Sequence, residues 1–515
     1  MAAIVTDQFR ISNANNFVDS VLSNDNSYYV FLGLANPGSS GNPVGFGRST
    51  TWDASPSVTP NPIDNFQYLS HYRNTGLFGN KITNANIRRV VRKVQWTANT
   101  RYDMFRHDYS AINLSPNSQS ARLYDSNYYV INSDFRVYIC IENGSSGTNL
   151  LGNTSKDEPT FTDLEPSAAG TSGDGYVWKY LFTVAPSDII KFDSTEYIAL
   201  PNDWATSTDF QIQSVRESGD SSINLNQIKT VYIADGGSGY SSKTYNIIGD
   251  GVGGKVSVTC DSSGKITDTV VVSGGSGYTF GIVDLESSGT VSNPAKLIPI
   301  IPPSRGHGYD LYSELGADKV LIYSRFDDST KDFPIDTSFA QVGIIKNPEE
   351  YNSPTIYKNN TYTSLGSIKV TNVTSTPTVG AAISQTRADG NVARGYVASY
   401  DIETKVIKYY QDRSLSFANS NDHTDANTVS TRGKLLSFES TSQAITPFGG
   451  SIDLNYQGIT TTIGSKQVSL GVTFTGGLAN PEINKNTGDI IYIDNRSLIS
   501  RDSRQKEDVK IILEF

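Results

Sequence analysis

The segment closest to a catalytic motif is Gly249-Asp-Gly-Val-Gly-Gly254-Lys255-Val256. It nearly matches the phosphate-binding loop G-x-x-x-x-G-K-[ST], in which backbone amides hold phosphates and the last hydroxyl binds magnesium. Val256 stands where that hydroxyl is needed, and the run Val-Ser-Val-Thr that it begins is typical of a strand. A phosphate loop is instead followed by a helix, whose N-terminus binds the anion. The sequence therefore predicts a hairpin turn here and no nucleotide site.

Two copies of Gly-Gly-Ser-Gly-Tyr, at residues 236–240 and 274–278, are candidates for a nucleophilic serine. A nucleophile elbow has the spacing G-x-S-x-G, but Tyr240 and Tyr278 occupy its last position. Glycines in such runs adopt positive φ in turns. We therefore interpret both copies as turns.

A basic run, Arg88-Arg-Val-Val-Arg-Lys93, has four positive charges in six residues. On an acidic protein such a run could meet an acidic partner or a phosphate. Charge runs more often form a solvated face. We predict a solvated face or an intersubunit salt bridge.

Two pairs of adjacent acids, Asp327-Asp328 and Glu349-Glu350, could in principle support glycosidase chemistry, which uses two carboxyl groups around one bond. Adjacent acids usually lie in surface turns, and we expect surface turns here.

His307, between two glycines, could bind a ligand or act in catalysis, but we predict a residue that packs in a loop.

Two cysteines, Cys140 and Cys260, are too few for a disulfide framework or a cysteine-rich metal site. They could form one disulfide, although two free buried thiols are favoured. The four histidines show no zinc-helix spacing. We therefore predict no catalytic residue, no cofactor and no metal site.

Charge and length narrow the class of protein further. The 515 residues suggest about three domains. With 42 Lys and Arg against 52 Asp and Glu, the net charge is −10, which argues against nucleic acid and anionic membranes as partners. No stretch approaches ~18 consecutive apolar residues, and the first residues lack a basic region followed by an apolar run. We expect neither membrane insertion nor a signal peptide.

The elements that must position these residues are mostly short strands, bounded by Gly, Asn, Asp and Ser. The clearest cover residues 319–323, 405–410, 434–438, 489–493 and 508–515. Helices are few: residues 15–22 place apolar side chains on one face after an asparagine cap, and residues 309–315 predict one or two turns that end at Gly316. The predicted class is mainly β, with short helices in long loops.

One strand stands out because both of its faces are apolar. From Tyr176 to Phe182, aromatic side chains alternate along one face, and Val177 and Leu181 lie on the other. A strand apolar on both faces is typical of the interior of a layered sheet.

Two stretches differ in composition from the rest. Residues 226–290 are rich in Gly, Ser and Val and contain both Gly-Gly-Ser-Gly-Tyr copies. Two copies are too few for a solenoid, so we interpret this stretch as a small β module built from two similar hairpins. Residues 355–475, rich in Thr, Ser and Asn, predict a second β module.

Several other segments each carry a set of residues that can be compared with a known family. The sets are Ala3-Ile-Val-Thr-Asp-Gln-Phe-Arg10; Phe46-Gly47-Arg48 followed by Trp52; Trp96-x-x-Asn-Thr-Arg101-Tyr102; Gly173-Asp174-Gly175-Tyr176-Val-Trp178-Lys-Tyr-Leu-Phe182 followed by Glu196-Tyr-Ile-Ala-Leu-Pro201; Gln341-Val-Gly-Ile-Ile-Lys-Asn-Pro348; Thr487-Gly-Asp-Ile-Ile-Tyr-Ile-Asp-Asn495-Arg496; and Val509-Lys-Ile-Ile-Leu-Glu-Phe515. In this order they resemble the baseplate wedge protein eight family of T-even-type contractile-tailed bacteriophages. The first set resembles the N-terminal strand of that family.

The resemblance covers about residues 1–225, 295–350 and 475–515, so the chain looks like an enlarged member with two inserted modules. It implies a layered β-sandwich core divided as 1–225, 291–354 and 476–515, with modules at 226–290 and 355–475. It also implies a homodimer that contacts other wedge proteins in the virion tail baseplate. Assembly in the host cytoplasm, a conformational change at host attachment and the absence of catalysis, cofactor and metal are further implications.

A protein of a different class remains as the alternative. A host-glycan binding or depolymerising tail protein would also be acidic, β-rich and aromatic. Such a protein should show long β-helix repeats or a trimeric fibre pattern, and the sequence shows neither beyond one pair of turns. A phosphate-handling enzyme, a third class, depends only on residues 249–256.

Overall fold

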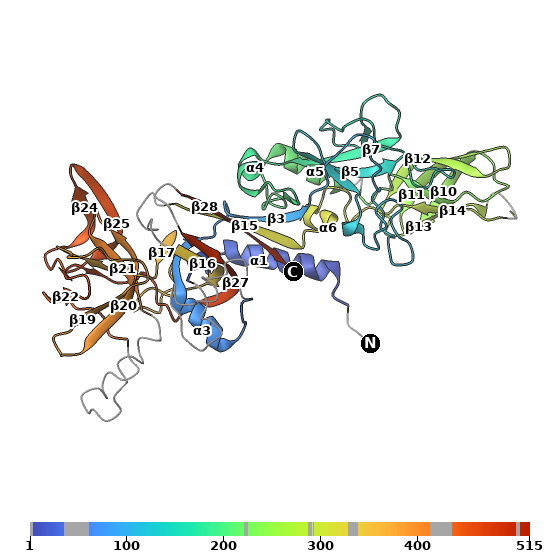
Figure 1. Cartoon of the computed structure of the whole chain (residues 1–515). Coiled ribbons are helices and arrows are strands. Elements are labelled where there is room, and N and C mark those ends of the chain that lie inside the picture. Colours follow the sequence, from blue (N-terminus) through green and yellow to red (C-terminus); the bar gives the residue numbers. More distant parts are fainter. Residues whose placement is uncertain are drawn as a thin grey trace. The chain divides into compact units, whose positions relative to one another are not determined.

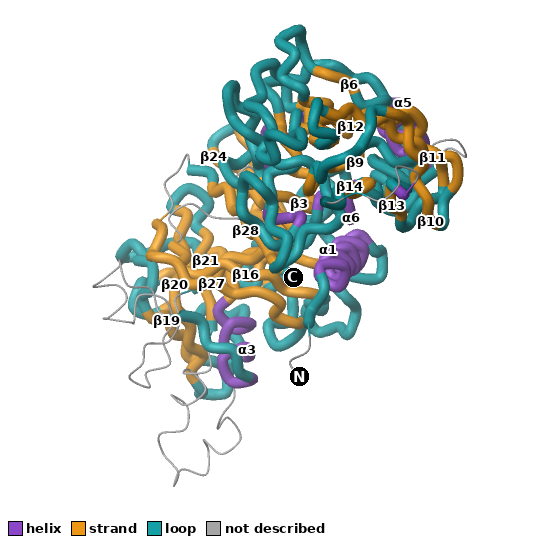
Figure 2. Tube along the Cα trace, turned by 90° about the vertical axis from the view of Figure 1, so that its right-hand side faces the viewer, coloured by secondary structure: helices purple, strands orange, loops and turns teal. Residues whose placement is uncertain are grey.

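The computed structural model describes residues 4–34, 61–220, 225–286, 291, 293–327, 338–411, 435–500 and 505–515. In these parts the chain is mainly β, with several antiparallel sheets and few short helices (Figure 1; Figure 2, strands in orange). This confirms the predicted fold class. The chain divides into two compact units, unit 1 with Met1–Val18, Arg88–Leu321 and Ile512–Phe515, and unit 2 with Asp19–Ile87 and Ile322–Ile511. The five-part domain division from the sequence stays a prediction.

The central sheet of unit 1 has the strand order β4-β5-β7-β6. Its strands are β4 (Tyr129–Ile131), β5 (Arg136–Asn143), β6 (Ser167–Ala168) and β7 (Tyr176–Thr183). β7 pairs antiparallel with both β5 and β6, so it is an inner strand (Figure 1). Tyr176, Trp178, Tyr180 and Leu181 have no exposed surface. The strand is thus buried on both faces, as its alternating pattern predicts.

A second sheet has the order β28-β15-β3-β8. Its strands are β3 (Ile87–Arg92), β8 (Tyr197–Ala199), β15 (Lys319–Phe326) and β28 (Glu507–Glu514). β3 and β8 pair antiparallel, with Val91 opposite Ile198. The predicted strands at 319–323 and 508–515 are confirmed.

The N-terminal helix α1 (Asp7–Leu22) begins eight residues before the predicted start at Asn15, and residues 7–10 are helical where the resemblance implied a strand. Two features explain the difference. The Thr6 hydroxyl accepts a hydrogen bond from the Phe9 amide, as an N-cap does. The buried residues of the helix then follow helical spacing from its second turn: Ile11, Ala14, Val18 and Val21. The predicted helix at residues 15–22 is therefore confirmed, whereas its predicted start and the strand implied for residues 7–10 were wrong.

The other helices are short. They are α3 (Phe66–Thr75) in unit 2 and α4 (Pro186–Phe192), α5 (Phe210–Asp220) and α6 (Leu311–Leu315) in unit 1. The Asp310 side chain caps α6, and Gly316 ends it with φ 71°. The prediction for residues 309–316 is confirmed.

The Gly-rich stretch of unit 1 forms a four-stranded sheet and a two-stranded sheet. Their strands are β9 (Val231–Asp235), β10 (Lys243–Gly249), β11 (Val252–Cys260), β12 (Ile266–Ser276), β13 (Gly281–Val283) and β14 (Lys296–Pro299). The larger sheet has the order β12-β11-β10-β13, and β9 pairs with β14. β10 and β11 form a hairpin, which confirms the hairpin turn predicted in residues 249–256.

The two Gly-Gly-Ser-Gly-Tyr copies share a turn but not a hairpin. In both copies the second and fourth positions have positive φ: Gly237, Gly239, Gly275 and Gly277. Each tyrosine is buried and its hydroxyl accepts a backbone amide, Ala295 N for Tyr240 at 2.9 Å and Gly254 N for Tyr278 at 3.0 Å. The interpretation as two similar hairpins was wrong, because β9 pairs with β14 whereas β12 pairs with β11.

This Gly-rich part is joined to the rest of unit 1 through the loop after Phe105. The buried Arg106 guanidinium lies 3.9 Å from the centre of the Tyr232 ring and donates two hydrogen bonds to Asp108. The next residue, His107, accepts the Ile301 amide on Nδ1 at 3.2 Å. Tyr232 belongs to the same hydrophobic cluster as β5 and β7.

Unit 2 has two five-stranded sheets, β17-β2-β1-β16-β27 and β19-β20-β21-β18-β26. The strands of the first are β1 (Tyr28–Gly33), β2 (Gly76–Lys81), β16 (Ser338–Lys346), β17 (Thr361–Thr363) and β27 (Asp489–Ser500). Those of the second are β18 (Gly366–Lys369), β19 (Ala382–Thr386), β20 (Val392–Asp401), β21 (Val406–Tyr410) and β26 (Leu478–Ala479). The remaining strands pair as β22 (Ala444–Ile445) with β23 (Gly450–Ser451) and β24 (Gly458–Ile463) with β25 (Lys466–Phe474).

Of the strands predicted in unit 2, those at 405–410 and 489–493 are confirmed. The prediction at 434–438 was wrong for residues 435–438, which form no strand, and Lys434 lies outside the described residues. Side chains bind the backbone there in place of a ladder: Gln411 donates to the Leu436 carbonyl and Arg387 to that of Ser437. Phe438 is still buried, 4.7 Å from the Tyr409 ring.

The described helices include none with the length and apolar character that crossing a bilayer requires.

The burial of β7 can be tested at Trp178. Replacing Trp178 with Ala should lower the free energy of unfolding by ~3–5 kcal/mol, because it leaves a cavity in a fully buried strand. Trp178→Phe should cost less, since the indole Nε1 has no hydrogen-bond partner in the described parts of the chain. Chemical denaturation monitored by fluorescence would measure both, and an unchanged midpoint in Trp178→Ala would contradict the burial.

The contact of His107 with Ile301 predicts a pH dependence of stability. Burial lowers the pKa of His107 and Arg106 adds to this effect, although the nearby Asp108 opposes it. Folding therefore favours the neutral imidazole of His107. The stabilisation that it gives is fully present above pH 6.5, the ordinary pKa of histidine, and is lost as the pH falls through the lowered pKa of His107. His107→Gln, which accepts a hydrogen bond but does not titrate, should flatten the change in unfolding free energy between about pH 7 and 5. An identical pH profile in both proteins would refute this.

Candidate functional site

The signature residues of unit 1 come together in one buried cluster beside β7. The Tyr176 hydroxyl accepts the Tyr102 amide and donates to the Asn153 carbonyl, both at 2.9 Å. The Tyr102 hydroxyl accepts the Thr97 amide at 2.6 Å, and the rings of Tyr102 and Trp178 meet edge to face at 5.8 Å. These groups hold loops against the sheet.

The signature turn Gly173-Asp174-Gly175 is also structural. Both glycines have positive φ, and a Cβ on Gly175 would lie 2.8 Å from the Gly144 Cα. The Asp174 carboxylate accepts the Tyr176 amide at 3.0 Å and the Lys156 amide at 2.8 Å. The turn thus fixes where β7 begins.

Of the other signature residues, Trp96 packs against the same hydrophobic core, and the rest of those that the structure describes lie elsewhere. Trp96 donates from Nε1 to the Ser155 hydroxyl at 3.1 Å, and Arg101 is exposed. In unit 2, Gln341 donates to the buried Asn495 side chain at 2.8 Å, and the exposed Arg496 pairs with Asp494 at 2.7 Å. Phe46, Gly47, Arg48 and Trp52 lie outside the described residues.

The basic run on β3 is bound within the chain, so the predicted solvated face is wrong for its first two members. Arg88 makes two hydrogen bonds of 2.8 Å to Asp188. Arg89 is 3% exposed, and its guanidinium lies 4.4 Å from the centre of the Tyr312 ring. An intersubunit salt bridge from this run stays a prediction.

The remaining sequence candidates show structural contacts. His307 is buried, with Nδ1 2.6 Å from the Glu314 carboxylate and its ring edge on Phe105, which confirms a residue packed in a loop. Glu349 and Glu350 sit in isolated bridges, opposite Ile356 and Ile483.

Asp328, the second member of the first acidic pair, lies outside the described residues. Both cysteines are free thiols, but only Cys140 is fully buried and Cys260 is partly exposed. Burial raises the pKa of both thiols. The described residues contain no group of three metal-ligating side chains.

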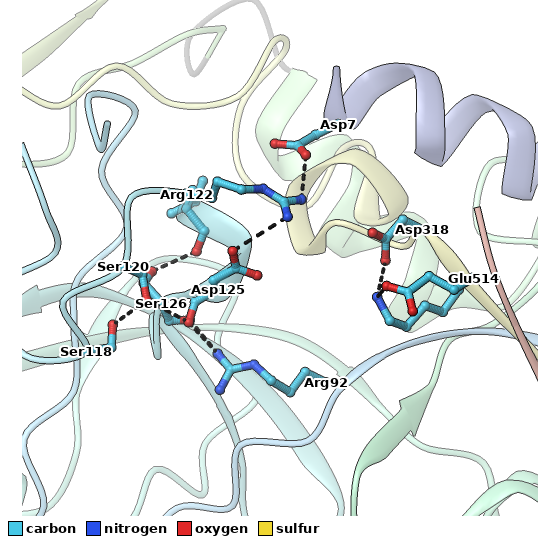
Figure 3. Close-up of polar contacts among 11 residues, drawn as sticks. Asp7, Arg92, Ser118, Ser120, Arg122, Asp125, Ser126, Asp318 and Glu514 are labelled. Carbon is cyan, nitrogen blue, oxygen red and sulfur yellow. Dashed lines mark hydrogen bonds and ion pairs between the residues drawn. The ribbon is translucent and has the colours of Figure 1, made fainter. Parts of the chain in front are cut away.

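A charged cleft of about 490 Å³ in unit 1 has room for a ligand larger than water, and Figure 3 shows the polar contacts of several charged residues around it. We call it the charged cleft. It is lined by Val91, Arg92, Lys93, Arg122, Tyr124, Asp125, Tyr129, Thr195, Glu196, Tyr197, Leu315, Gly316, Asp318, Lys319 and Glu514. Four of these side chains are cationic and four are acidic.

Five segments far apart in the sequence build the cleft. The end of β3, the loop with the short helix η1 (Leu123–Asp125), the start of β8, the link from α6 to β15 and the end of β28 each supply part of its wall. Gly316 is required here, because a Cβ would collide with the Tyr124 ring. Tyr124 in turn donates to the Ser313 carbonyl at 2.6 Å, which ties the loop to α6.

Two cations of the cleft are paired with carboxylates from the two ends of the chain. Arg122 contacts Asp7 of α1 at 2.5 Å and Asp125 at 3.6 Å (Figure 3). Lys319 contacts Asp318 and Glu514 of β28, each at 2.9 Å. Burial disfavours the charge of Lys319, but the two hydrogen bonds outweigh burial and raise its pKa; the same contact lowers the pKa of Glu514.

Arg92 is bound differently, by neutral acceptors. Its guanidinium donates to Asn127 Oδ1 at 2.7 Å and to the carbonyls of Asp125 and Ser126 at 3.2 and 2.8 Å (Figure 3). Among the described residues no carboxylate pairs with it. Arg92 is therefore a cation held in a fixed orientation without a neutralising partner.

The loop that carries Arg122 is held by a buried carboxylate. Asp103 has no exposed surface and accepts the amides of Asn117, Ser118 and Asn127 at 2.9, 3.1 and 3.4 Å, and the Ser118 hydroxyl. Because Asp103 follows Tyr102, the signature cluster and the cleft loop share this short segment.

The chemistry of the cleft is that of binding. Its lining residues are mostly charged or polar, and its cations Arg122 and Lys319 already hold carboxylates. Of its charged residues, Arg92 and Lys93 belong to the basic run, and Glu196 and Glu514 belong to segments that carry the family resemblance. Arg122 and Asp125 belong to no motif, and no local signal marks them as lining a site.

Asp103 should be essential for the shape of the cleft. Asp103→Asn places an amide NH₂ among backbone donors and should lower the free energy of unfolding by ~1–3 kcal/mol. Hydrogen exchange at the amides of residues 117, 118 and 127 should accelerate, whereas Asp163→Asn, at an exposed acid, should change neither quantity. Unchanged exchange at these amides would show that Asp103 does not hold the loop.

Comparison with known proteins gives one informative similarity. A segment of 223 residues is 28% identical to the baseplate wedge protein gp8 of Enterobacteria phage T4 and covers 39% of this chain. The chain spans 60% of the length of that protein. No protein-family model matches the chain.

Proposed function

We propose that this chain is a structural subunit of a phage tail baseplate wedge that acts through protein–protein contacts and not through catalysis. The observation that carries the proposal is the 28% identity with the baseplate wedge protein gp8 over 223 residues. That name describes the relative, and its role is transferred here as a proposal for the whole chain.

The positions of the signature residues support a structural role. Tyr102, Asp174, Tyr176 and Trp178 fill a buried cluster and bind backbone groups. Catalytic residues would instead face a cavity, with a nucleophile, a base or an acid within hydrogen-bond distance. The mixed charges of the cleft suit a polar protein contact.

The finer part of the proposal concerns assembly. The subunit forms a homodimer, contacts other wedge proteins and takes part in a conformational change when the phage attaches to its host. Sheets with open edges in both units are suited to pairing with another chain, because an edge strand presents unpaired amides and carbonyls.

Location in the particle tests the proposed role. Gold-labelled antibodies against this chain, applied to the phage that encodes it, should mark the baseplate in electron micrographs. Label on fibres or spikes, with loss of host-glycan binding when the antibody is present, would favour the glycan-binding alternative and contradict the wedge role.

The dimer is tested in solution. Light scattering of the purified chain at micromolar concentration should give about twice the chain mass of 56.0 kDa. A mass of one chain across that concentration range would contradict the homodimer and leave the location of the protein as a separate question.

A further inference from the structure

We propose that the charged cleft is a docking site for a carboxylate-bearing polypeptide segment of a neighbouring protein, and that Asp7 and Glu514 occupy the places of its carboxylates when the segment is absent. The inference rests on the proposed structural role, because it names where one neighbouring protein is held. Three observations carry it.

The first observation is that two cations of the cleft already bind carboxylates supplied by the two end segments of the chain, of which Asp7 lies outside the cleft lining and Glu514 belongs to it. Asp7 comes from the first turn of α1 and contacts Arg122, and Glu514 comes from the last residues of β28 and contacts Lys319 (Figure 3). Both cations are thus oriented for a carboxylate at hydrogen-bond distance. Another chain that offers the same group finds the same geometry.

The second observation is that these internal carboxylates are easily replaced. The side chains of Asp7 and Glu514 are 34% and 63% exposed, and Arg122 is 40% exposed. Ion pairs of this exposure contribute little to stability, because water and salt screen them. Exchange of one carboxylate for another therefore has a small cost.

The third observation is Arg92, the fixed cation with neutral acceptors only. Its orientation is set before any ligand arrives, which lowers the cost of ordering on binding. A carboxylate placed here would add a charge-assisted hydrogen bond without displacing an existing ion pair.

The mixture of charges indicates a polypeptide as the occupant. Four acids offset the four cations of the lining, so the cleft lacks the positive excess that a nucleic acid or another polyanion requires. Glu196 is exposed and makes no ion pair among the described residues, so it can receive a basic side chain. The volume of about 490 Å³ lies within the ~300–1,000 Å³ of pockets that enclose ligands.

The test measures binding of a defined probe to the full chain. A fluorescein-labelled hexapeptide with alternating Glu and Gly is titrated at low salt by fluorescence anisotropy, and the same peptide with Gln in place of Glu is the matched probe. The Glu peptide should bind and weaken as salt rises, whereas the Gln peptide should bind at least tenfold more weakly. Equal binding of both peptides would overturn the proposal.

The variants separate docking from a merely structural role. Asp7→Asn and Glu514→Gln remove the internal competitors and should tighten binding about threefold each. Arg92→Gln, Arg122→Gln and Lys319→Gln should weaken it about fivefold or more. If an ion pair only held the cleft in shape, removing either its cation or its carboxylate would weaken peptide binding. Tighter binding in the carboxylate variants together with weaker binding in the cation variants therefore identifies a docking site. Weaker binding in Asp7→Asn or Glu514→Gln, in protein with an unchanged thermal midpoint, would contradict the placeholder role.

A matched ion pair elsewhere in unit 1 provides the control. Lys229 and Glu165 are 2.8 Å apart and 25% and 60% exposed, close to the 22% and 63% of Lys319 and Glu514. Lys229→Gln and Glu165→Gln should leave the affinity unchanged. Complete displacement of the Glu peptide by inorganic phosphate or N-acetylneuraminic acid at equal anion concentration would identify a site for small anions. That result would contradict a polypeptide as the occupant of the cleft.

Failure of this inference and failure of the proposed function are distinguishable. If antibodies mark the baseplate but the Glu peptide does not bind, only the cleft proposal fails. If the label lies elsewhere, the wedge role fails whatever the peptide does.

Discussion

The burial of β7 on both faces is the constraint from which the rest of unit 1 follows. A strand with no exposed surface at Tyr176, Trp178 and Tyr180 cannot leave its polar groups to water, so protein groups must bind them, and the Trp178 indole Nε1 is an exception. The tyrosine hydroxyls bind backbone or threonine oxygens. On the opposite face Lys179 donates to the Leu164 carbonyl at 2.6 Å, and burial lowers its pKa to about 8 although Glu314 and Glu165 oppose that effect. The loops that cover β7 are therefore fixed by hydrogen bonds to it, and they in turn fix the cleft.

The path from this core to the cleft is short and consists of oriented hydrogen bonds. Tyr102 is tied to Tyr176, and the next residue, Asp103, holds the loop that presents Arg122. On the far side of that loop, Tyr128 donates to the Glu314 carbonyl of α6 at 2.6 Å. The loops of the cleft are thus held by hydrogen bonds, whereas two of the carboxylates that pair with its cations, Asp7 and Glu514, come from exposed end segments of the chain. Rigid walls with replaceable contents are what a docking site requires.

Sequence patterns correctly predicted the helices and strands that depend on interactions between residues close in sequence. The alternation along residues 176–182 and the Gly316 stop of α6 depend on neighbours in sequence, and both are found. The start of α1 and the segment 435–438 depend on groups elsewhere: a buried helix face in one case, and the side chains of Gln411 and Arg387 in the other. The cleft was beyond prediction for the same reason, because its charges come from five segments between Arg92 and Glu514 that only the fold brings together.

The Gly-rich strands of unit 1 pack both among themselves and against the central sheet. Their tyrosines and valines form a cluster of their own, which a free-standing module would need. Yet Tyr232 of β9 also belongs to the cluster of β5 and β7, and its ring covers the buried Arg106 guanidinium at 3.9 Å. Without that ring, Arg106 would keep its pair with Asp108 but lose the apolar cover that keeps water from the pair. The stability of the central sheet is therefore coupled to these strands through several contacts, of which this cation and ring are one, and a boundary drawn at residue 226 cuts through that coupling.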